Sequence, residues 1–256
     1  MATRDGDLKN PVRTAQTTFR VLEALKDLEG ATLTELSGHL DMAKSSTHNY
    51  LRTLEHEGYF VSDGRTYRVG LRFLDLGGWA RTRRQLYHVA RPEIKTLVEE
   101  TGELVNLLVE ESGCGVFLHR EKGVDAVNVD SFIGECIALH TTALGKTILA
   151  YLPRERVDEI VDENGLPAKT EQTITDRDEL FAELDRIGER GVAFDDEERI
   201  RGLCCVAVPI RSDDRIRGAL SVSGPTSRLG PERNRKPIAD ALQRTANIIE
   251  LNLTYS

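Results

Sequence analysis

Apolar residues recur at intervals of three and four near the start of the chain, which is the spacing of amphipathic helices. The pattern predicts three helices, at about residues 17–28, 33–40 and 44–57. Gly30 follows the first helix and Gly58 follows the third, and glycine commonly ends a helix. We therefore expect three short helices that pack on a shared apolar core.

Two segments rich in β-forming residues come next. Residues 59–62 and 66–69 flank Asp63-Gly64-Arg65, and Asp-Gly between β-formers is a strong hairpin signal. Three helices followed by a hairpin is the order of a winged helix-turn-helix. The sequence thus predicts a flexible arm at residues 1–14 and a winged helix-turn-helix DNA-binding domain at residues 15–70.

A helical stretch with an apolar side follows the hairpin and is expected to end near Arg84. Its apolar residues are Leu71, Leu74, Leu76 and Trp79. We assign residues 71–91 to a connector helix, whose apolar side can pair with a second copy of itself. A further helix is predicted at residues 92–101, with proline in its first turn.

The rest of the chain alternates between strand and helix patterns. Strands are predicted at residues 104–109, 114–120, 126–129, 137–140, 205–211 and 219–223. Helices are predicted at residues 143–151, 154–162, 177–190 and 233–253. Strands joined mostly by tight turns, with helices at the start, middle and end, indicate an α+β sheet domain at residues 92–256.

Charge is distributed unevenly along the chain, whose formal net charge is −8. Residues 1–91 hold 14 Lys and Arg against 11 Asp and Glu, which gives +3, whereas residues 92–256 hold 20 against 31, which gives −11. A polyanion such as DNA is therefore expected to meet the N-terminal part first. No apolar run approaches the ~18 residues of a membrane helix, and the first residues lack a secretory signal, so we expect a cytoplasmic protein without membrane association.

The four cysteines form no Cys-x-x-Cys pair, so the sequence indicates neither a metal site nor a redox dithiol. They are Cys114, Cys136, Cys204 and Cys205. We expect four free thiols, as in a reducing compartment, and no metal or other cofactor.

The third predicted helix carries small hydroxyl and hydrogen-bonding side chains that suit the edges of bases in the major groove. Ser45 or Lys44 is expected to cap its first turn, where free N–H groups attract phosphate. Thr47 is expected to face the core, although it lies within the candidate segment. The candidate DNA-binding residues are Lys44, Ser45, Ser46, Thr47, His48, Asn49, Arg52 and, at the hairpin tip, Arg65. The alternative is a three-helix module for protein contacts.

Several motifs together resemble the IclR family of bacterial and archaeal regulators. Thr32 to Leu40 reads T-x-x-E-L-x-x-x-L, and the segment from Ala43 reads A-K-S-S-T-H-N-Y-L-R-T-L-E-x-x-G-Y. Matching blocks follow in the second half, at residues 139–146, 194–198, 202–209 and 221–225. The resemblance covers nearly the whole chain. It implies a GAF-like effector-binding domain behind the DNA-binding domain, and a regulator whose DNA affinity depends on a small molecule, with no catalytic residues.

The candidate effector-binding residues make physical sense beside this resemblance. The N–H groups of Ala143 and Leu144 open a helix and suit a carboxylate, while Ser221 and Ser223 lie two apart on a strand and share a face. The full set is Val129, Ala143, Leu144, Asp195, Leu203, Cys205, Ser221 and Ser223. Cys204 stands where the family commonly has arginine, which puts in doubt the charge balance around Asp195.

Other interpretations stay open at this point. Ser221 and Ser223 can simply pack on a buried strand, and residues 196–198 can form a solvated acidic loop. Cys205, with His140 and Asp195, can be imagined as an enzyme's nucleophile, base and orienting group. The second domain can also serve oligomerisation alone. The expected partners are double-stranded DNA with a roughly palindromic operator, a small acid or sugar-derived effector, and a second copy in a homodimer, with a dimer of dimers also open.

Overall fold

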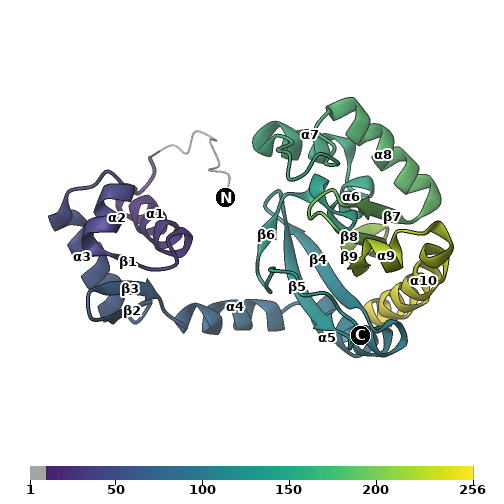
Figure 1. Ribbon diagram of the computed structural model, residues 1–256, viewed down its shortest axis with the longest axis horizontal. Helices are drawn as coiled ribbons and strands as arrows, with labels where there is room; N and C mark the ends of the chain where they lie inside the picture. The colour runs from purple at the N-terminus through teal and green to yellow at the C-terminus, as the bar shows by residue number, and fades with distance from the viewer. Residues whose placement is uncertain (1–9, 256) are drawn as a thin grey trace. The chain divides into compact units, whose positions relative to one another are not determined.

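The computed structural model describes residues 10–255. The chain divides into two compact units, one ending at Ala80 and the other beginning at Arg81 (Figure 1). Residues 1–9 of the expected flexible arm lie outside the described residues.

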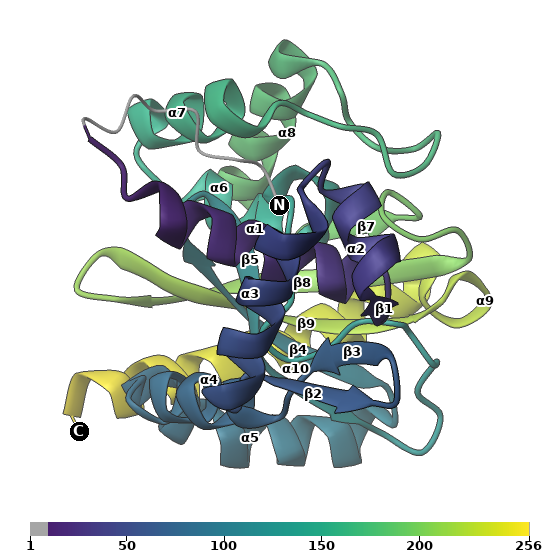
Figure 2. The same cartoon turned by 90° about the vertical axis from the view of Figure 1, so that its left-hand side faces the viewer.

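The N-terminal unit is a winged helix-turn-helix. Its elements are α1 (Arg13–Asp27), β1 (Ala31–Thr32), α2 (Leu33–His39), α3 (Lys44–His56), β2 (Phe60–Asp63) and β3 (Thr66–Val69) (Figure 2). The three strands form an antiparallel sheet in the order β1-β3-β2, and β1 is too short to leave a sequence signal. A core of buried side chains joins the helices to the sheet, including Val21, Leu25, Leu36, Leu51 and Phe60.

The first turn of α2 is fixed by a capping box, in which a hydroxyl and a carboxylate satisfy free N–H groups reciprocally. Thr32 Oγ1 accepts a hydrogen bond from Glu35 N–H at 3.4 Å, and Glu35 Oε2 accepts one from Thr32 N–H at 2.8 Å. This bond and the Thr32 hydroxyl lower the pKa of Glu35. The cap sets the position at which α2 leaves β1, and thereby the approach to α3.

The bounds of two helices differ from those predicted for the connector helix and for the helix at residues 92–101. α4 (Arg72–Thr82) ends early, and α5 runs from Gln85 to Thr101, so Pro92 lies inside a helix and not in its first turn. Proline removes one backbone hydrogen bond from a helix interior. Here Leu86, Tyr87 and Ala90 before the proline are buried on the same apolar face as residues after it, and this burial keeps the helix continuous.

The C-terminal unit is built on one six-stranded antiparallel sheet in the order β6-β5-β4-β9-β8-β7. The strands are β4 (Leu104–Glu111), β5 (Cys114–Lys122), β6 (Cys136–Ile137), β7 (Ala193–Asp196), β8 (Leu203–Ser212) and β9 (Arg215–Pro225). The helices after α5 are the 3₁₀ helix η1 (Leu139–Thr141), α6 (Ala143–Ala150), α7 (Arg154–Asn164), α8 (Arg177–Arg190), α9 (Thr226–Leu229) and α10 (Glu232–Tyr255). The predicted α+β class, a winged helix-turn-helix followed by an α/β sheet domain, is confirmed.

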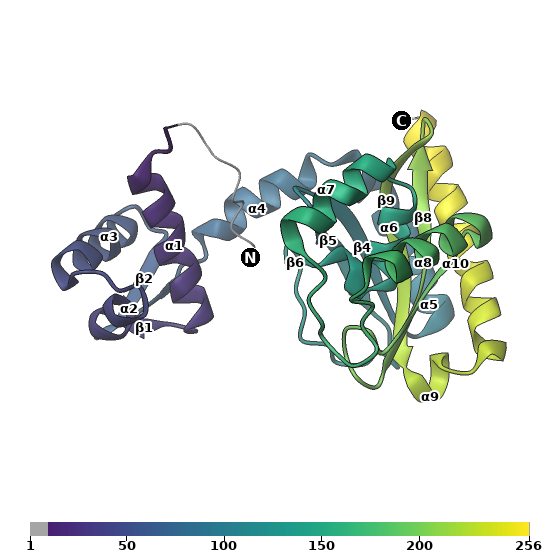
Figure 3. The same ribbon diagram turned by 90° about the horizontal axis from the view of Figure 1, so that it is seen from above.

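Helices cover both faces of this sheet (Figure 3). α5 and α10 pack side by side on one face, against residues such as Val105, Val206 and Val222. α6, α7 and α8 cover the other face, where Leu108, Ala207 and Ala219 point. Successive residues of a strand alternate between the faces, so each strand contributes to both cores. No helix among residues 10–255 has the length and apolar character needed to cross a bilayer.

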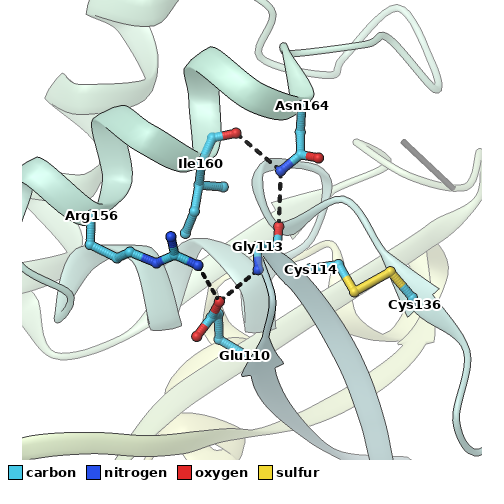
Figure 4. Close-up of a disulfide and its surroundings, with 7 residues drawn as sticks. All are labelled: Glu110, Gly113, Cys114, Cys136, Arg156, Ile160 and Asn164. Atoms are coloured by element: carbon cyan, nitrogen blue, oxygen red, sulfur yellow. Dashed lines mark hydrogen bonds and ion pairs between the residues drawn. A yellow bond between two sulfur atoms is a disulfide. The ribbon is translucent and has the colours of Figure 1, made fainter. Parts of the chain in front are cut away.

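The segment between β5 and β6 departs from the predictions. Residues 126–129 form no strand, because Gly123 and Asp125 turn the chain there and β5 pairs instead with the two-residue edge strand β6. Cys114 and Cys136 are joined by a disulfide, with their Cα atoms 5.7 Å apart, so the expectation of four free thiols is wrong (Figure 4). The pairing of two neighbouring strands brings together cysteines that are 22 residues apart in the chain.

The tight turn beside the disulfide is held by α7 (Figure 4). Glu110 Oε1 accepts hydrogen bonds from Gly113 N–H at 2.7 Å and from Arg156 Nη2 at 3.1 Å. Asn164 Nδ2 donates to the carbonyl oxygen of Gly113 at 3.2 Å. The β4–β5 turn, and with it the start of β5, is therefore fixed from both sides.

Candidate DNA-binding helix and effector cavity

α3 presents a polar, solvent-exposed face. Six of the residues predicted for it are exposed, namely Lys44, Ser45, Ser46, His48, Asn49 and Arg52, and Arg65 is exposed at the hairpin. Thr47 is an error in the candidate set, because its side chain is fully buried and its hydroxyl donates to the carbonyl oxygen of Ala43 at 3.2 Å. Thr47, Leu51 and Leu54 anchor the helix, and its other side stays available.

The predicted side-chain cap on α3 is also wrong. The N-cap residue is Ala43, and no side chain of the described residues accepts a hydrogen bond from the first turn. A hydroxyl of Ser45 lies inside the helix and therefore cannot occupy the N-cap position. The unused N–H groups at this end carry the positive pole of the helix, which favours a phosphate oxygen.

Side chains from neighbouring strands of the larger sheet form two rows on the face that α6 covers. In one row, Leu104, Ser223, Cys205 and Asp195 lie opposite one another across β4, β9, β8 and β7. In the other row, Arg120, Asn106 and Ser221 lie opposite one another across β5, β4 and β9. The polar groups come from distant parts of the chain, and the strand register brings them together.

A cavity lies between these rows and the start of α6, with about 390 Å³ of empty space including its open mouth. All eight predicted effector-binding residues line it: Val129, Ala143, Leu144, Asp195, Leu203, Cys205, Ser221 and Ser223. An equal number of lining residues was not predicted from the sequence, namely Leu104, Asn106, Phe117, Arg120, Ser131, Thr142, Arg199 and Ile200. Strand alternation could have found Asn106 and Arg120, whereas Arg199 comes from a loop that has no such periodicity.

The two serines belong to a hydrogen-bond network. Asn106 Nδ2 donates to Ser223 Oγ at 3.2 Å and reaches Ser221 Oγ at 3.5 Å, while Asn106 Oδ1 accepts from Arg120 Nε at 2.9 Å. Both serines are buried. They are thus more than small residues on a packed strand, because Asn106 orients both hydroxyls as acceptors.

The start of α6 faces the cavity. Thr142 caps the helix, with its Oγ1 accepting from Gly145 N–H at 3.0 Å and its carbonyl oxygen accepting from Lys146 N–H at 2.9 Å. The N–H groups of Ala143 and Leu144 have no partner among residues 10–255. These two donors remain available to a ligand oxygen, as the sequence led us to expect.

Asp195 is a buried carboxyl at the far end of the rows. Burial, and next the charge of Glu198, raise its pKa to about 7, while a hydrogen bond from Glu198 N–H to Asp195 Oδ1 at 2.8 Å opposes the shift. Glu198 is itself buried against the ammonium group of Lys146, and burial raises its pKa too. The acidic segment is therefore not uniformly solvated, since Glu198 lies inside the unit and Asp196 pairs with Arg235 at its surface.

The geometry does not support the imagined nucleophile, base and orienting group. Cys205 faces Asp195 across β7 and β8, but burial and the carboxylate raise the pKa of its thiol well above the usual value. His140 does not line the cavity, and its Nε2 lies 3.2 Å from the carbonyl oxygen of Pro167. Among residues 10–255, no group of three or more His, Cys, Asp or Glu side chains is placed to hold a metal ion.

Comparisons with known proteins agree on one family. The model of the IclR helix-turn-helix domain matches residues 14–64, and that of the bacterial transcriptional regulator IclR C-terminal domain matches residues 80–251. The probable HTH-type transcriptional regulator ArcR of Halobacterium salinarum is 32% identical over 91% of this chain and 90% of its own length.

Two solved structures share the fold. The Thermotoga maritima IclR structure has a TM-score of 0.75 at 28% identity, covering 96% of this chain and 100% of its own. An IclR homologue from Microbacterium hydrocarbonoxydans, complexed with 4-hydroxybenzoate, has a TM-score of 0.79 at 24% identity, covering 93% of this chain and 98% of its own. These relatives are regulators and not enzymes. The chain belongs to the IclR family of transcriptional regulators.

Proposed function

We propose that this regulator binds its operator through the exposed face of α3, and that its operator affinity changes when a small organic acid binds in the cavity of its C-terminal unit. The cavity is the observation that carries the proposal. Eight polar and apolar side chains expected from the sequence converge there with two free helix N–H groups. A domain that served oligomerisation alone would have no need for oriented serines around an open space.

The DNA-reading half of the proposal rests on α3. Ser45, Asn49 and Arg52 recur at intervals of three and four on its exposed side, so one groove edge can contact all three. Arginine and asparagine each make bidentate contacts with bases, worth about 1–3 kcal/mol of discrimination. Arg65 is exposed at the hairpin, and we expect it to contact the neighbouring phosphates or minor groove.

The test is to replace Arg52 by alanine and measure operator binding by fluorescence anisotropy, using DNA fragments that the protein retains in the cell. We expect at least about a fivefold loss of affinity, in keeping with the lower end of a single base contact. Lys26→Ala is the matched control, because it removes an exposed positive charge from α1 of the same unit. Equal losses from both variants would mean that charge alone, and not α3, decides operator binding.

The effector half rests on the chemistry of the cavity and on the 4-hydroxybenzoate held by the Microbacterium homologue. Its donors are the N–H groups of Ala143 and Leu144 and the hydroxyls of Ser221 and Ser223, which suit a carboxylate and a nearby hydroxyl or carbonyl. A ligand shifts DNA affinity by binding two arrangements of the protein unequally. Ser221→Ala is expected to weaken the response to effector and to leave operator affinity without effector unchanged.

We further propose that the protein acts in the cytoplasm as a homodimer, with a dimer of dimers built from it. The large apolar side chains on and beside α4 are exposed, with Leu71 at 80% and Leu74 at 69%, and a second copy is the partner that a self-complementary helix fits. Twofold symmetry then calls for a roughly palindromic operator with half-sites about 10 base pairs apart. Sedimentation equilibrium of Leu74→Lys against the unchanged chain tests this pairing.

A further inference from the structure

Arg120 is a guanidinium of the cavity wall that forms no ion pair with the described residues. Arg120 donates from Nε to Asn106 Oδ1 at 2.9 Å and from Nη1 to the carbonyl oxygen of Ser131, and both acceptors are neutral. No carboxylate oxygen lies within 4.0 Å of its nitrogens in the described part of the chain. Its second terminal nitrogen, Nη2, makes no hydrogen bond to these residues. The guanidinium is half-buried and lines the cavity.

A second guanidinium lies close to it but is already paired. Arg199 Nη2 lies 2.8 Å from Glu135 Oε1, and the side chains of both residues are largely buried. Arg120 and Arg199 lie over the ring of Phe117, with guanidinium carbons 5.0 Å and 5.7 Å from its centroid. At the β5 end of the cavity, two guanidinium groups therefore share one nearby carboxylate, that of Glu135. Burial and the charge of Arg199 lower the pKa of Arg120, whereas Glu135 raises it.

Such an arrangement is unfavourable without a further anion. A charge removed from water is costly unless it is paired. Lysine or histidine can lose a proton in these surroundings, but arginine remains charged in proteins. The cost therefore persists until an anion arrives, and the planar guanidinium is shaped to hold an oxyanion through two parallel hydrogen bonds.

A neighbouring hydroxyl points to the same kind of ligand. Ser131 Oγ is buried and has no hydrogen-bond partner in residues 10–255, although the carbonyl oxygen of the same residue is bound to Arg120. Unsatisfied buried hydroxyls are uncommon and call for a partner. Ser131 and Arg120 both line the cavity, so an oxyanion bound there has a guanidinium and an unpartnered hydroxyl as its donors.

We propose that Arg120 determines specificity in the effector cavity: its guanidinium pairs with the acid group of the effector, and a neutral analogue of the same shape is excluded. This inference rests on the proposed effector cavity. The side chain of Cys204, where the family commonly has arginine, lies on the opposite face of the sheet, 3.4 Å from Asp196 Oδ1, and does not contribute to the cavity. The positive charge of the cavity is supplied by β5.

The test uses the full chain and an anion of known identity. Thermal unfolding is followed in sulfate and in sodium chloride of equal ionic strength, for the unchanged chain, Arg120→Gln and Arg217→Gln. Arg217 is a suitable control because it pairs at the surface with Asp213, 3.1 Å away. Sulfate should raise the melting temperature of the unchanged chain and of the control more than chloride does, and Arg120→Gln should bind sulfate about 10- to 100-fold more weakly.

Crystals soaked in selenate give the position of the anion. Anomalous density beside Arg120 Nη2, absent from the Arg120→Gln crystals, is the expected result. Density only at other arginines, or equal stabilisation of all three proteins by sulfate, overturns the inference.

Operator binding separates this inference from the function on which it rests. If selenate occupies the Arg120 site but no carboxylic acid from a metabolite panel changes operator affinity, the anion site stands and the proposed gating fails. If an acid changes operator affinity equally in the unchanged chain and in Arg120→Gln, the gating stands and the role of Arg120 is refuted. A neutral amide that acts as strongly as its parent acid refutes it too.

Discussion

Replacing Asp195 by asparagine should remove a pH-dependent weakness from the fold. The carboxyl is 2% exposed, and its pKa is raised from 3.8 to about 7. Between these values the folded chain holds a proton that the unfolded chain has lost, so stability falls as the pH rises through this window. Asparagine carries no such proton and can still accept the hydrogen bond from Glu198 N–H through its Oδ1.

The magnitude follows from the difference between the two pKa values. One unit of pKa corresponds to about 1.36 kcal/mol, so ionising Asp195 in the folded state costs roughly 4 kcal/mol of unfolding free energy at high pH. Part of this penalty is already present at pH 5, because the unfolded carboxyl is then mostly ionised. Between pH 5 and pH 8 the unchanged chain should therefore lose about 2–3 kcal/mol relative to Asp195→Asn.

Urea denaturation followed by circular dichroism at several pH values measures this difference. Asp240→Asn, at an exposed position of α10, is the control and should follow the unchanged chain. Parallel pH profiles for the unchanged chain and Asp195→Asn would refute the reasoning, because they would mean that Asp195 titrates alike in the folded and unfolded states.

Two further predictions concern the frame around the cavity. Replacing both Cys114 and Cys136 by serine opens a 22-residue loop, which should lower the free energy of unfolding in urea by about 3 kcal/mol. Cys205→Ser is the control, because Cys205 is a free thiol and its replacement opens no loop. Gly145→Ala places a methyl group 2.0 Å from the carbonyl oxygen of Leu139, so α6 must shift at a cost of about 1–3 kcal/mol. The melting temperature should fall and effector affinity with it, and an unchanged response to effector would contradict the close packing of α6 on η1.

Sequence reasoning worked best where one local rule decides the outcome. α8 has the predicted bounds, Arg177–Arg190, because its apolar face is regular and Gly191 ends it with a φ of 72°. It failed where burial overrides the local rule. Pro92 predicts the start of a helix, but the apolar residues before it extend α5 by two turns towards the N-terminus.

The residues of the cavity also fall into those that a local rule predicts and those that it does not. Ser221 and Ser223 are recognisable because alternation along a strand places both on one face, and the family motifs mark Asp195 and Cys205. Arg199 reaches the cavity from a loop, and the disulfide depends on which strand pairs with β5, so neither follows from spacing along the chain. These features depend on which distant segments pair in the sheet, and that pairing cannot be derived from a single sequence.

The separate cores of the two units have a consequence for how such regulators diversify. Phe60 and its neighbours complete one core, while Val206 and Ala207 belong to the two cores on either side of the larger sheet. A substitution that retunes α3 for another DNA sequence therefore need not disturb the packing around the cavity, and the reverse also holds. During evolution, exchanging the first eighty residues with those of a related regulator can therefore bring new genes under the control of the same effector.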